Sequence, residues 1–424
     1  MGLMIILILV FFLLLGYPMF MPMTVGALVI MKMYAPNIDL VVMAQQYITG
    51  VSTYVLLAIP MFIFAADIMS KGYTSNRLVD LVKAYCGHLS GGLAVTIAGA
   101  CTIFGAISGS ANATVVAIGK PMRQKMIENG YTVENTDALI VSSATIAALI
   151  PPSINMIMYC VLTGTSVGEL FMAGIIPGLL VFLAFAVYNY IDARKSNILK
   201  SDKLTIREKL QVTRKSLLSL GFPAIIVGGI YSGIFSPTEA AAVAVLYAVV
   251  CEMIIYKTVK LSDLKDIALS TGIMTATVFI LISAGQAFTW MITFMQIPQM
   301  LTTAMLGVDP SAIKVIFVVT LFFFMACMFV DQIVAMLILL PIFFPVAMSA
   351  GIDPIYLGII VSVQAAIGSV TPPFGSNIFV ACAAFDRPYM DIIKGLPAYL
   401  IMFFIISLMI IFIPEISTAY RLFM

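Results

Sequence analysis

The chain has 424 residues, of which 62% are hydrophobic and only 10% are charged, and its formal net charge is +2. A soluble domain has about 25% charged residues, so this chain has too few polar side chains to cover a water-facing surface. The composition excludes a soluble enzyme, a disordered tail and a disulfide-rich secreted module, and it predicts an integral membrane protein with many spans. The near balance of charge gives no indication of a nucleic-acid partner.

Long charge-poor stretches follow one another from the amino end to residue 414. A helix needs roughly 20 apolar residues to cross the hydrocarbon, so these stretches predict about ten to twelve crossings. Residues 4–15 and 400–413 are almost continuously apolar, whereas the strands of a membrane barrel alternate apolar and polar residues. We therefore expect an all-α polytopic membrane protein, whose first apolar segment is a retained membrane helix rather than a removed signal peptide.

The first unusual element is an uncharged run within residues 93–119 that is rich in Gly, Ser, Asn and Thr. We interpret it as a re-entrant hairpin, because such a run suits a lipid-facing helix poorly. Its expected tip carries the side chains of Ser108, Ser110, Asn112 and Thr114. The half-helix amino end at this tip has partial positive charge, which suits an anionic group. Close helix packing through the GxxxG spacing of Gly105 and Gly109 is the alternative, but it does not explain the four polar side chains.

The next element lies near residues 138–163, where Pro151 and Pro152 stand in a long apolar segment. Proline has no N–H and clashes with the carbonyl four residues earlier, so the pair would free the carbonyls of Ala147 and Ala148. In hydrocarbon an unpaired carbonyl is costly unless protein, water or an ion satisfies it. We expect a broken helix at this position.

Residues 192–215 form the only long polar interruption and carry eight Lys or Arg against three Asp or Glu. The positive-inside rule places such a loop in the cytoplasm. Because it lies near mid-chain, we interpret it as a basic linker between a first repeat, residues 1–191, and a second repeat, residues 216–424. Shortly afterwards, the spacing of Ser236 and Glu239 around a proline is typical of a capping box, so we interpret Glu239 as part of a helix start and not as a catalytic acid.

The second half repeats the pattern of the first at an offset of 221 residues. Pro372 and Pro373 match the earlier proline pair and predict a second broken helix near residues 355–385. The same offset predicts a second hairpin near residues 315–341, which contains Asp331 in an apolar run. A carboxylate at membrane depth is a functional hypothesis by default, and a structural or an ion-linked role is open for it.

Both predicted breaks offer ligands for a small hard cation. Freed carbonyls would lie beside neutral side-chain oxygens of Ser153, Asn155, Thr371, Ser376 and Asn377. Interrupted apolar segments at matching places in two halves also point to the binding site of a transporter. Two kinks stabilised by neighbouring helices are the alternative, but two matched Pro-Pro pairs, each followed by Ser and Asn, favour the functional interpretation.

Five segments together resemble the large membrane subunit of tripartite ATP-independent periplasmic (TRAP) transporters, the DctM-like family. They are Gly105-Ala-Ile-Ser-Gly-Ser-Ala111, Ile150-Pro-Pro-Ser-Ile-Asn-Met-Ile-Met-Tyr159, Phe171-Met-Ala-Gly-Ile-Ile-Pro-Gly178, Gly233-Ile-Phe-Ser-Pro-Thr-Glu-Ala-Ala-Ala-Val243 and Thr371-Pro-Pro-Phe-Gly-Ser-Asn377. The resemblance covers almost the whole chain. One departure is Lys120, which stands where the family usually keeps a neutral run.

The resemblance implies two inverted repeats, each with a re-entrant hairpin and a broken helix, in a transport domain that moves as an elevator beside a fixed scaffold. It implies a multi-pass protein of the bacterial inner membrane that is coupled to inward Na⁺ and has no organic cofactor. Its implied partners are a separate small four-helix membrane subunit and a soluble periplasmic binding protein. The implied substrate is an organic acid anion, such as a C4-dicarboxylate or sialic acid.

The predicted site lies between the first hairpin tip and the second break. The predicted Na⁺ ligands are Ser108, Ser110, Asn112, Asn155, Gly368, Thr371, Gly375 and Asp331. The predicted substrate contacts are Ser110, Thr114, Pro151, Pro152, Pro373, Ser376 and Asn377.

Four other functions are alternatives to a transporter that depends on a binding protein. The closest alternative is a stand-alone sodium/dicarboxylate symporter that needs no binding protein. An enzyme is not expected, because the chain has a single histidine, His88, six scattered cysteines and no paired carboxylates at depth. A channel is a further possibility, which saturable uptake would exclude. ATP-driven transport has no support, since no GxxxxGK[ST] loop is present.

Overall fold

The computed structural model describes residues 2–195, 198, 203–307 and 309–423. Part of the basic linker, including Lys200 and Asp202, therefore lies outside the described residues. Within the described ranges every regular element is a helix. The predicted fold class, an all-α polytopic membrane protein, is confirmed.

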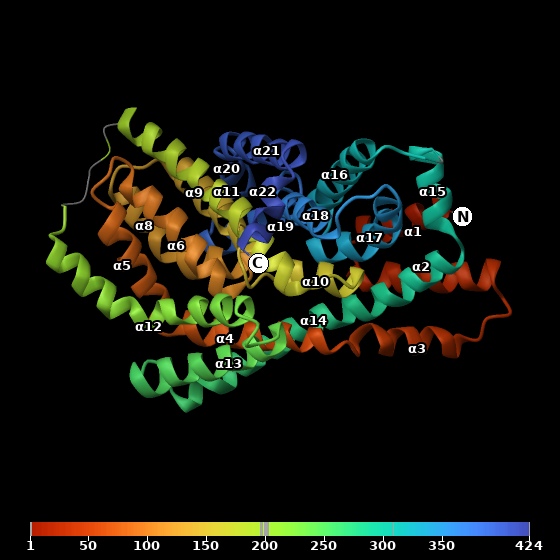
Figure 1. The fold of residues 1–424 in the computed structure, drawn as a ribbon, viewed down its shortest axis with the longest axis horizontal. Coiled ribbons are helices and arrows are strands. Elements are labelled where there is room, and N and C mark those ends of the chain that lie inside the picture. Colours follow the sequence, from red (N-terminus) through yellow and green to blue (C-terminus); the bar gives the residue numbers. More distant parts are fainter. Residues whose placement is uncertain (1, 196–197, 199–202, 308, 424) are drawn as a thin grey trace.

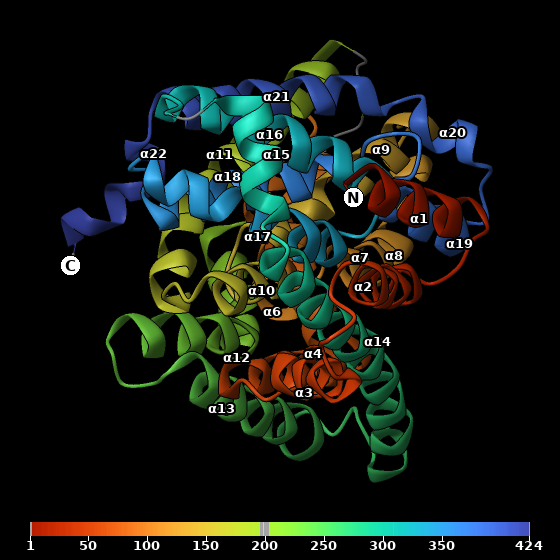
Figure 2. The same cartoon turned by 90° about the vertical axis from the view of Figure 1, so that its right-hand side faces the viewer.

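Six helices pack along one side of the molecule, and we call them the base group. They are α2 (Phe20–Tyr34), α3 (Leu40–Val51), α4 (Ala58–Lys71), α12 (Ile206–Tyr231), α13 (Pro237–Val249) and α14 (Leu261–Phe294). The long α14 packs against α2, α3 and α4, and α13 packs against α4 and α12. In both Figure 1 and Figure 2 the helices α3, α4, α12 and α13 lie on the lower side of the molecule.

The remaining body consists mainly of two runs of helices, and we call these runs the core group. The first run is α6 (Gly92–Ser108), α7 (Ala111–Thr114), α8 (Lys120–Glu128), α9 (Val133–Ala144), α10 (Ile154–Thr163) and α11 (Val167–Lys195). The second run is α16 (Ala312–Phe329), α17 (Gln332–Ser349), α18 (Pro354–Gly368), α19 (Ser376–Phe385), α20 (Tyr389–Ile393) and α21 (Leu396–Phe412).

Short elements complete the chain. Helices α1 (Gly2–Leu14), α15 (Ile297–Leu306) and α22 (Glu415–Thr418) lie at the edges, and α5 (Thr74–Cys86) packs against both α12 and α6. Tight 3₁₀ turns cover Tyr54–Leu57, Thr145–Ala148 and Ala419–Phe423, and wide π turns cover Val115–Gly119 and Val250–Ile255. Helix α5 therefore connects the base group to the core group.

Six helices of the described chain are long and apolar enough to cross a membrane, or seven if Leu396–Phe412 and Glu415–Leu422, which meet at 82°, count as one span. This number is lower than the expected ten to twelve full crossings. Six further apolar helices have only 10–17 residues, because the chain breaks or turns inside the apolar stretches. Breaks of this kind need protein, water or a ligand around the backbone groups that they leave unpaired.

The two runs of the core group have the same order of elements. Each has a helix pair with a tight tip, a helix that ends at a Pro-Pro pair, a ten-residue helix after the break, and a later long helix. Both Pro151-Pro152 and Pro372-Pro373 have cis peptide bonds. Ser110 and Asp331, which are 221 residues apart, are the N-cap residues of α7 and α17. That the hairpins are re-entrant and the repeats inverted stays a prediction.

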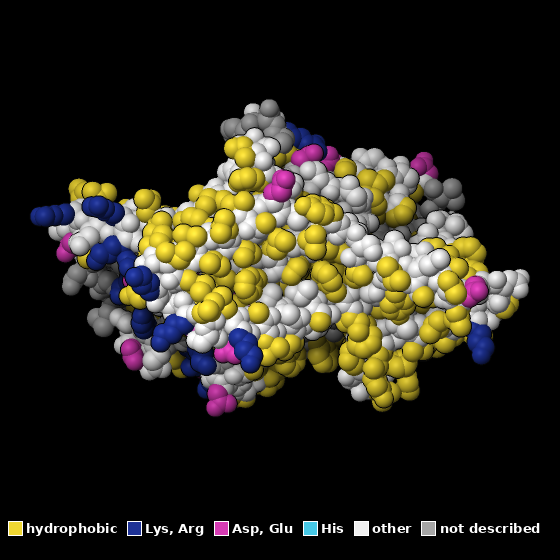
Figure 3. Space-filling view, turned by 90° about the horizontal axis from the view of Figure 1, so that it is seen from below, with side chains coloured by type: hydrophobic (Ala, Val, Ile, Leu, Met, Phe, Trp, Pro, Cys, Tyr) yellow, Lys and Arg dark blue, Asp and Glu magenta, His cyan; other side chains and the backbone are white. Residues whose placement is uncertain are grey.

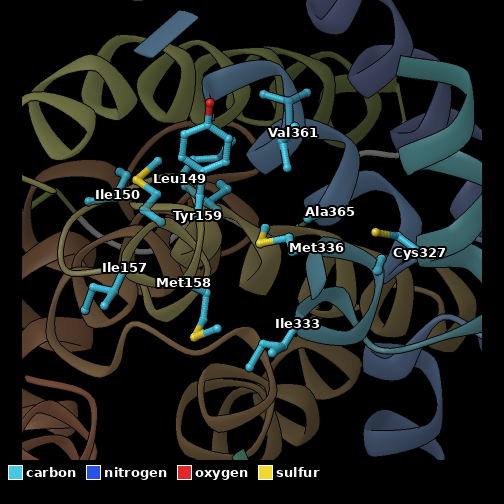
Figure 4. Packing of buried hydrophobic residues seen from close by; sticks show 14 of the residues in the cluster. Leu149, Ile150, Ile157, Met158, Tyr159, Cys327, Ile333, Met336, Val361 and Ala365 are labelled. Atoms are coloured by element: carbon cyan, nitrogen blue, oxygen red, sulfur yellow. The ribbon is translucent and has the colours of Figure 1, made fainter. Parts of the chain in front are cut away.

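The two runs interlock at their breaks. Helix α10, which follows the first break, packs against α17 of the second hairpin, and α19, which follows the second break, packs against α7 of the first hairpin. The Tyr159 hydroxyl of α10 also donates to the carbonyl of Pro354 at 2.6 Å, at the start of α18. Figure 4 shows Leu149 of the first break, Met336 of α17 and Val361 of α18 in one packed region. Each short helix is thus held by the opposite run.

Glycines allow the closest contacts between hairpin and break in each run. A Cβ on Gly105 of α6 would lie 2.8 Å from Cα of Ala147, and a Cβ on Gly368 of α18 would lie 2.3 Å from Cβ of Cys327 on α16. Ala147 and Gly368 are 221 residues apart, and Cys327 is one residue beyond the position that matches Gly105. A corresponding contact therefore has its glycine on the hairpin in the first run and on the break in the second. Close packing therefore explains Gly105. Gly109 also packs closely, against the carbonyl of Pro152, and its backbone has φ +60°, which favours glycine.

Two glutamates hold helix starts, one in the base group and one at the connecting helix α5. The Glu239 carboxylate accepts from the backbone and hydroxyl of Ser236 at 2.8 and 2.7 Å, which confirms that Glu239 belongs to a helix start. Glu252 is fully buried and caps α5 from a different element, since it accepts from the backbone N–H groups of Tyr73 at 2.9 Å and Thr74 at 3.1 Å. The hydroxyl of Thr258 donates to it as well. Glu252 therefore fixes the turn between α4 and α5.

The substitution Glu252→Gln is expected to lower the free energy of unfolding by about 1–3 kcal/mol. The reason is that one acceptor oxygen becomes an NH₂ group that faces buried N–H donors. Thermal unfolding of the detergent-purified protein measures the change. The control Glu239→Gln alters an exposed cap and is expected to cost about 1 kcal/mol or less. Equal stability of the two variants would contradict the assigned role of Glu252.

Basic side chains gather at one end of the molecule. Figure 3 shows most of the Lys and Arg side chains of this face at its left end, where Figure 1 places α5, α8 and the start of α12. The space-filling surface between this end and the opposite end is largely hydrophobic in Figure 3. The distribution agrees with the positive-inside rule, which assigns the basic end to the cytoplasm.

Candidate functional site

A cavity of about 200 Å³ lies between the base group and the core group. Its base-group wall is formed by α4 and α14, and its core-group wall by the first hairpin tip and the starts of α10, α17 and α19. Its polar lining residues include Asp67, Thr277, Ser110, Asn112, Asn155, Asp331, Gln332, Ser376 and Asn377. Its volume is below the roughly 300–1,000 Å³ typical for drug-sized ligands, so it suits a small solute.

The first hairpin tip is closed by its own hydroxyl groups. Ser108 Oγ accepts from the backbone N–H of Ser110 at 3.3 Å and shares a hydrogen bond of 3.2 Å with Thr114 Oγ1. Thr114 also donates to the carbonyl of Ser110 at 2.9 Å, and the side chain of Ser110 caps α7 through Ala113. These bonds hold a tight turn in which Gly109 alone adopts the left-handed conformation.

The first break is joined to that tip through the backbone. Ile154 N–H donates to the carbonyl of Gly109 at 3.4 Å, and a Cβ on Gly109 would lie 2.5 Å from the carbonyl oxygen of Pro152. Asn155, in the first turn of α10, donates through its amide nitrogen to Gln332 of α17. The first break and the second hairpin therefore meet at the cavity.

The second hairpin and break have an equivalent arrangement. Phe374 N–H donates to the carbonyl of Met328 at 3.2 Å, close to the tip. Asp331 caps α17, because its Oδ1 accepts from the N–H of Ile333 at 2.9 Å. From the sequence, a structural role and an ion-linked role are both open for Asp331. The structure shows the structural role, a helix cap, and also places Asp331 in the cavity wall.

The carbonyls that the prolines release from helical bonds find donors nearby. Ala148 O accepts from Ser153 Oγ at 2.8 Å. Gly368 O accepts from Thr371 N–H at 3.1 Å, and Ser369 O accepts from Asn377 N–H at 3.0 Å. A carbonyl oxygen has two lone pairs, so each of these oxygens retains capacity for a second partner.

Two asparagines in the cavity wall have buried amide atoms without a hydrogen-bond partner among the described residues. They are Oδ1 of Asn112 and both amide atoms of Asn377, and Asn377 is fully buried. Buried polar atoms are almost always hydrogen-bonded in folded proteins, so such exceptions indicate a bound ligand or water. Both residues line the cavity.

The cavity brings together about half of the predicted site residues. Those that line it are Ser108, Ser110, Asn112, Asn155, Asp331, Ser376 and Asn377. Those that do not are Thr114, Pro151, Pro152, Gly368, Thr371, Gly375 and Pro373. The second set supports the tips and breaks: Thr371 Oγ1, for example, donates to Ile367 O at 2.7 Å, and a Cβ on Gly375 would lie 2.6 Å from Ser369 O.

Three polar residues of the wall were missed by sequence reasoning. They are Gln332 of α17, Asp67 of α4 and Thr277 of α14. The sequence could have indicated Asp67, because it is a carboxylate in an apolar segment. However, Ser70 and Lys71 follow it closely, so it looks like part of the polar end of that segment. Within the described part of the chain no group of three or more His, Cys, Asp and Glu is arranged to hold a metal ion. A cation in this cavity would depend mainly on neutral oxygens.

A solved structure has a similar fold. The YdaH transporter of Alcanivorax borkumensis superposes with a TM-score of 0.64 at 14% sequence identity, over 87% of this chain and 86% of that chain. At this identity the similarity shows the fold alone. The fold is therefore one that a known membrane transporter also has.

Sequence comparison identifies the family. The chain is 48% identical to the ectoine/5-hydroxyectoine TRAP transporter large permease protein of Ruegeria pomeroyi and 47% identical to the ectoine TRAP transporter large permease protein of Halomonas elongata, in each case over 96% of both chains. It is 39% identical to the C4-dicarboxylate TRAP transporter large permease protein of Pseudomonas aeruginosa, over 86% of both chains. The family profile of the tripartite ATP-independent periplasmic transporter, DctM component, matches residues 6–416. The chain thus belongs to the DctM family, the large permeases of TRAP transporters.

Proposed function

We propose that this large permease imports a small solute that carries a carboxylate, through the cavity between the base group and the core group, with Na⁺ as the coupling ion. The observation that carries the proposal is the fully buried Asn377, which lines this cavity and whose two amide atoms have no partner among the described residues. An amide nitrogen there can donate to a carboxylate oxygen, while the amide oxygen can accept from a solute or contact a cation.

The electrostatics of the core-group wall support the binding of a carboxylate. Helices α10 and α19 both begin at the cavity, since Asn155 and Asn377 are in their first turns and line it. The amino end of a helix has partial positive charge and free N–H donors, and it stabilises an anion. We assign the carboxylate of the solute to this wall.

Two Na⁺ positions are proposed, one beside each break. The first uses oxygens of Ser108, Ser110, Asn112 and Asn155, and the second uses the region of Gly368, Thr371 and Gly375 with Asp331 nearby. Support comes from the break carbonyls, each of which has one donor and a second lone pair. Transporters of known architecture bind coupling cations at unwound helix positions of this kind.

The movement that we propose is an elevator, in which the core group carries the solute past the base group. The cavity has one wall on each group, so a relative displacement would open it to one side and close it to the other. The proposed setting is the bacterial inner membrane. The proposed partners are a small four-helix membrane subunit, which contacts the base group, and a periplasmic binding protein that delivers the solute.

The relatives narrow the candidate substrates. The two at 47–48% identity are permeases for ectoine, and the one at 39% is a permease for C4-dicarboxylates. We propose ectoine or a chemically similar solute first, and a C4-dicarboxylate second. Ectoine has a carboxylate together with a delocalised amidinium cation, so it retains the anionic group that the core-group wall requires.

The test is uptake into proteoliposomes that contain the large permease with its small membrane subunit. Labelled ectoine is supplied with its binding protein, with and without an inward Na⁺ gradient at constant ionic strength. Saturable uptake that needs Na⁺ and the binding protein supports the proposal. Uptake that is equally fast without the binding protein would favour a stand-alone symporter, and ohmic current would favour a channel.

The substitution Asn377→Leu is expected to lower the apparent affinity for the solute about 10- to 100-fold, because hydrogen bonds to charged groups contribute about 1.5–3 kcal/mol. Equilibrium binding of labelled ectoine to the purified complex measures the change. The control Asn76→Leu makes the same change at an exposed position of α5 outside the cavity. Unchanged affinity in the Asn377 variant would place the solute elsewhere.

A further inference from the structure

The fixed charge of the cavity is negative. Among the described residues that line it are two carboxylates, Asp67 and Asp331, and no Lys, Arg or His. The carboxylate of Asp331 is engaged at the start of α17, where the N–H of Ile333 donates to it at 2.9 Å. Asp67 is therefore the carboxylate of the wall that does not cap a helix.

Asp67 lies on the base-group wall, opposite the helix starts of the core group. It belongs to α4, and the Thr271 hydroxyl of α14 donates to its Oδ2 at 3.0 Å. The ion pairs of the described chain do not include Asp67. The hydroxyl groups of Thr271 and Ser270 are neutral and leave the charge of the carboxylate uncompensated, so Asp67 retains capacity for a cationic partner.

The core-group wall also carries a carboxylate, that of Asp331, but the N–H of Ile333 at the start of α17 donates to it. The wall presents the starts of α10 and α19, together with the unpartnered amide of the buried Asn377. These groups favour an anion through helix-end charge and N–H donors. The cavity thus has an anion-accepting wall and a cation-accepting wall.

We propose that Asp67 binds a positively charged group of the transported solute, so that the cavity selects zwitterions, which carry a cation and a carboxylate, over dianions. The inference rests on the proposed function of the cavity and adds the chemical class of the substrate. Asp67 is in this account a specificity-determining residue that contacts the solute.

The physical reason is the cost of removing charge from water. A buried carboxylate is strongly disfavoured unless it is paired. A zwitterion pairs its cation with Asp67 and its carboxylate with the core-group wall. A dianion places a second carboxylate near Asp67, and like charges that lie close together repel across a medium of low dielectric constant. Asp67 would thus favour the zwitterion by attraction and disfavour the dianion by repulsion, and specificity often depends on both effects.

The experiment compares a zwitterion with a dianion in the same preparation. Labelled ectoine and labelled succinate are tested for equilibrium binding to the complex of large permease and small membrane subunit, at fixed Na⁺ and ionic strength. For the unmodified protein we expect ectoine to bind more tightly than succinate. The isosteric substitution Asp67→Asn is expected to weaken ectoine binding about 10- to 100-fold and to leave succinate binding unchanged or stronger.

Two further variants separate a role in selectivity from a role in folding. Asp67→Glu keeps the charge and is expected to retain the preference for ectoine. Asp266→Asn removes a carboxylate of α14 that lines the neighbouring outer pocket with Asp67 but not the central cavity, and it is expected to leave the preference unchanged. The melting temperature of each variant shows whether the fold is intact.

The outcomes distinguish this inference from the proposed function. If Asp67→Asn weakens both solutes equally, or neither, the selectivity role is wrong while the transport cavity stands. If succinate binds more tightly than ectoine to the unmodified protein, the zwitterion preference is wrong. If Asn377→Leu affects neither solute, the proposed cavity itself is wrong, and the Asp67 inference fails with it.

Discussion

Replacement of Asp137 by asparagine is expected to destabilise the protein by about 3–5 kcal/mol, the effect of removing one partner from a buried charge pair. Asp137 of α9 is fully buried and lies between two arginines of different runs. Arg123 of α8 approaches its Oδ1 at 2.5 Å, and Arg387, just after α19, approaches its Oδ2 at 3.8 Å. Without the carboxylate, two cations would remain close together at the contact between the runs.

A large fall in melting temperature of the Asp137→Asn variant, measured in detergent, would show this effect. The control is Asp391→Asn, since Asp391 pairs with Arg387 and Lys394 at the partly exposed side of the same network. Exposed pairs contribute about 0–1 kcal/mol, so the control is expected to lose little stability. If both variants melt at the temperature of the unmodified protein, the charge pair does not hold the runs together.

The substitution Gly368→Ala is expected to abolish transport. The new Cβ would lie 2.3 Å from Cβ of Cys327 and 2.8 Å from its carbonyl carbon. Since backbone atoms cannot move aside as a flexible side chain can, the second break must shift away from the second hairpin. Overpacking of this kind costs about 1–3 kcal/mol, occasionally more, and it displaces Asn377, whose N–H is bonded within the same turn.

Uptake and melting temperature together check the prediction for Gly368. The matched control is Gly272→Ala on α14, where a Cβ would meet no atom within 4 Å. The control is expected to transport normally and to melt at an unchanged or slightly higher temperature, because alanine favours helix more than glycine does. Normal uptake by Gly368→Ala would show that the contact with α16 tolerates separation.

The sequence contained enough information to predict the fold class and the family, and less to predict the site. Proline pairs and polar residues inside apolar runs are local signals, so the positions of Pro151, Asn112 and Asn377 were evident. The helices of the core group, however, are apolar on most faces. Their sequences therefore have no hydrophobic periodicity from which the side that faces a cavity could be predicted. For that reason Thr371 was grouped with Asn377 although its hydroxyl bonds to the helix behind it.

Residues that come from the opposite run or the base group were the hardest to predict. Gln332 reaches the cavity only because α10 of one run packs against α17 of the other. Asp67 reaches it because α4 lies beside α14 and below the first hairpin tip. Both depend on the packing of segments that are far apart in the chain, and a single sequence does not report such contacts.

The length of α14 has a consequence for the surrounding lipid. Its 34 residues span about 50 Å at 1.5 Å per residue, whereas the hydrocarbon core is about 30 Å thick. A helix that is longer than the hydrocarbon is thick either tilts strongly or extends beyond the acyl chains. Figure 1 shows α14 running obliquely past α2, α3 and α4. If the proposed elevator movement follows the inclined α14, the core group would shift within the bilayer plane as well as across it, and the lipids beside it would have to rearrange in each transport cycle.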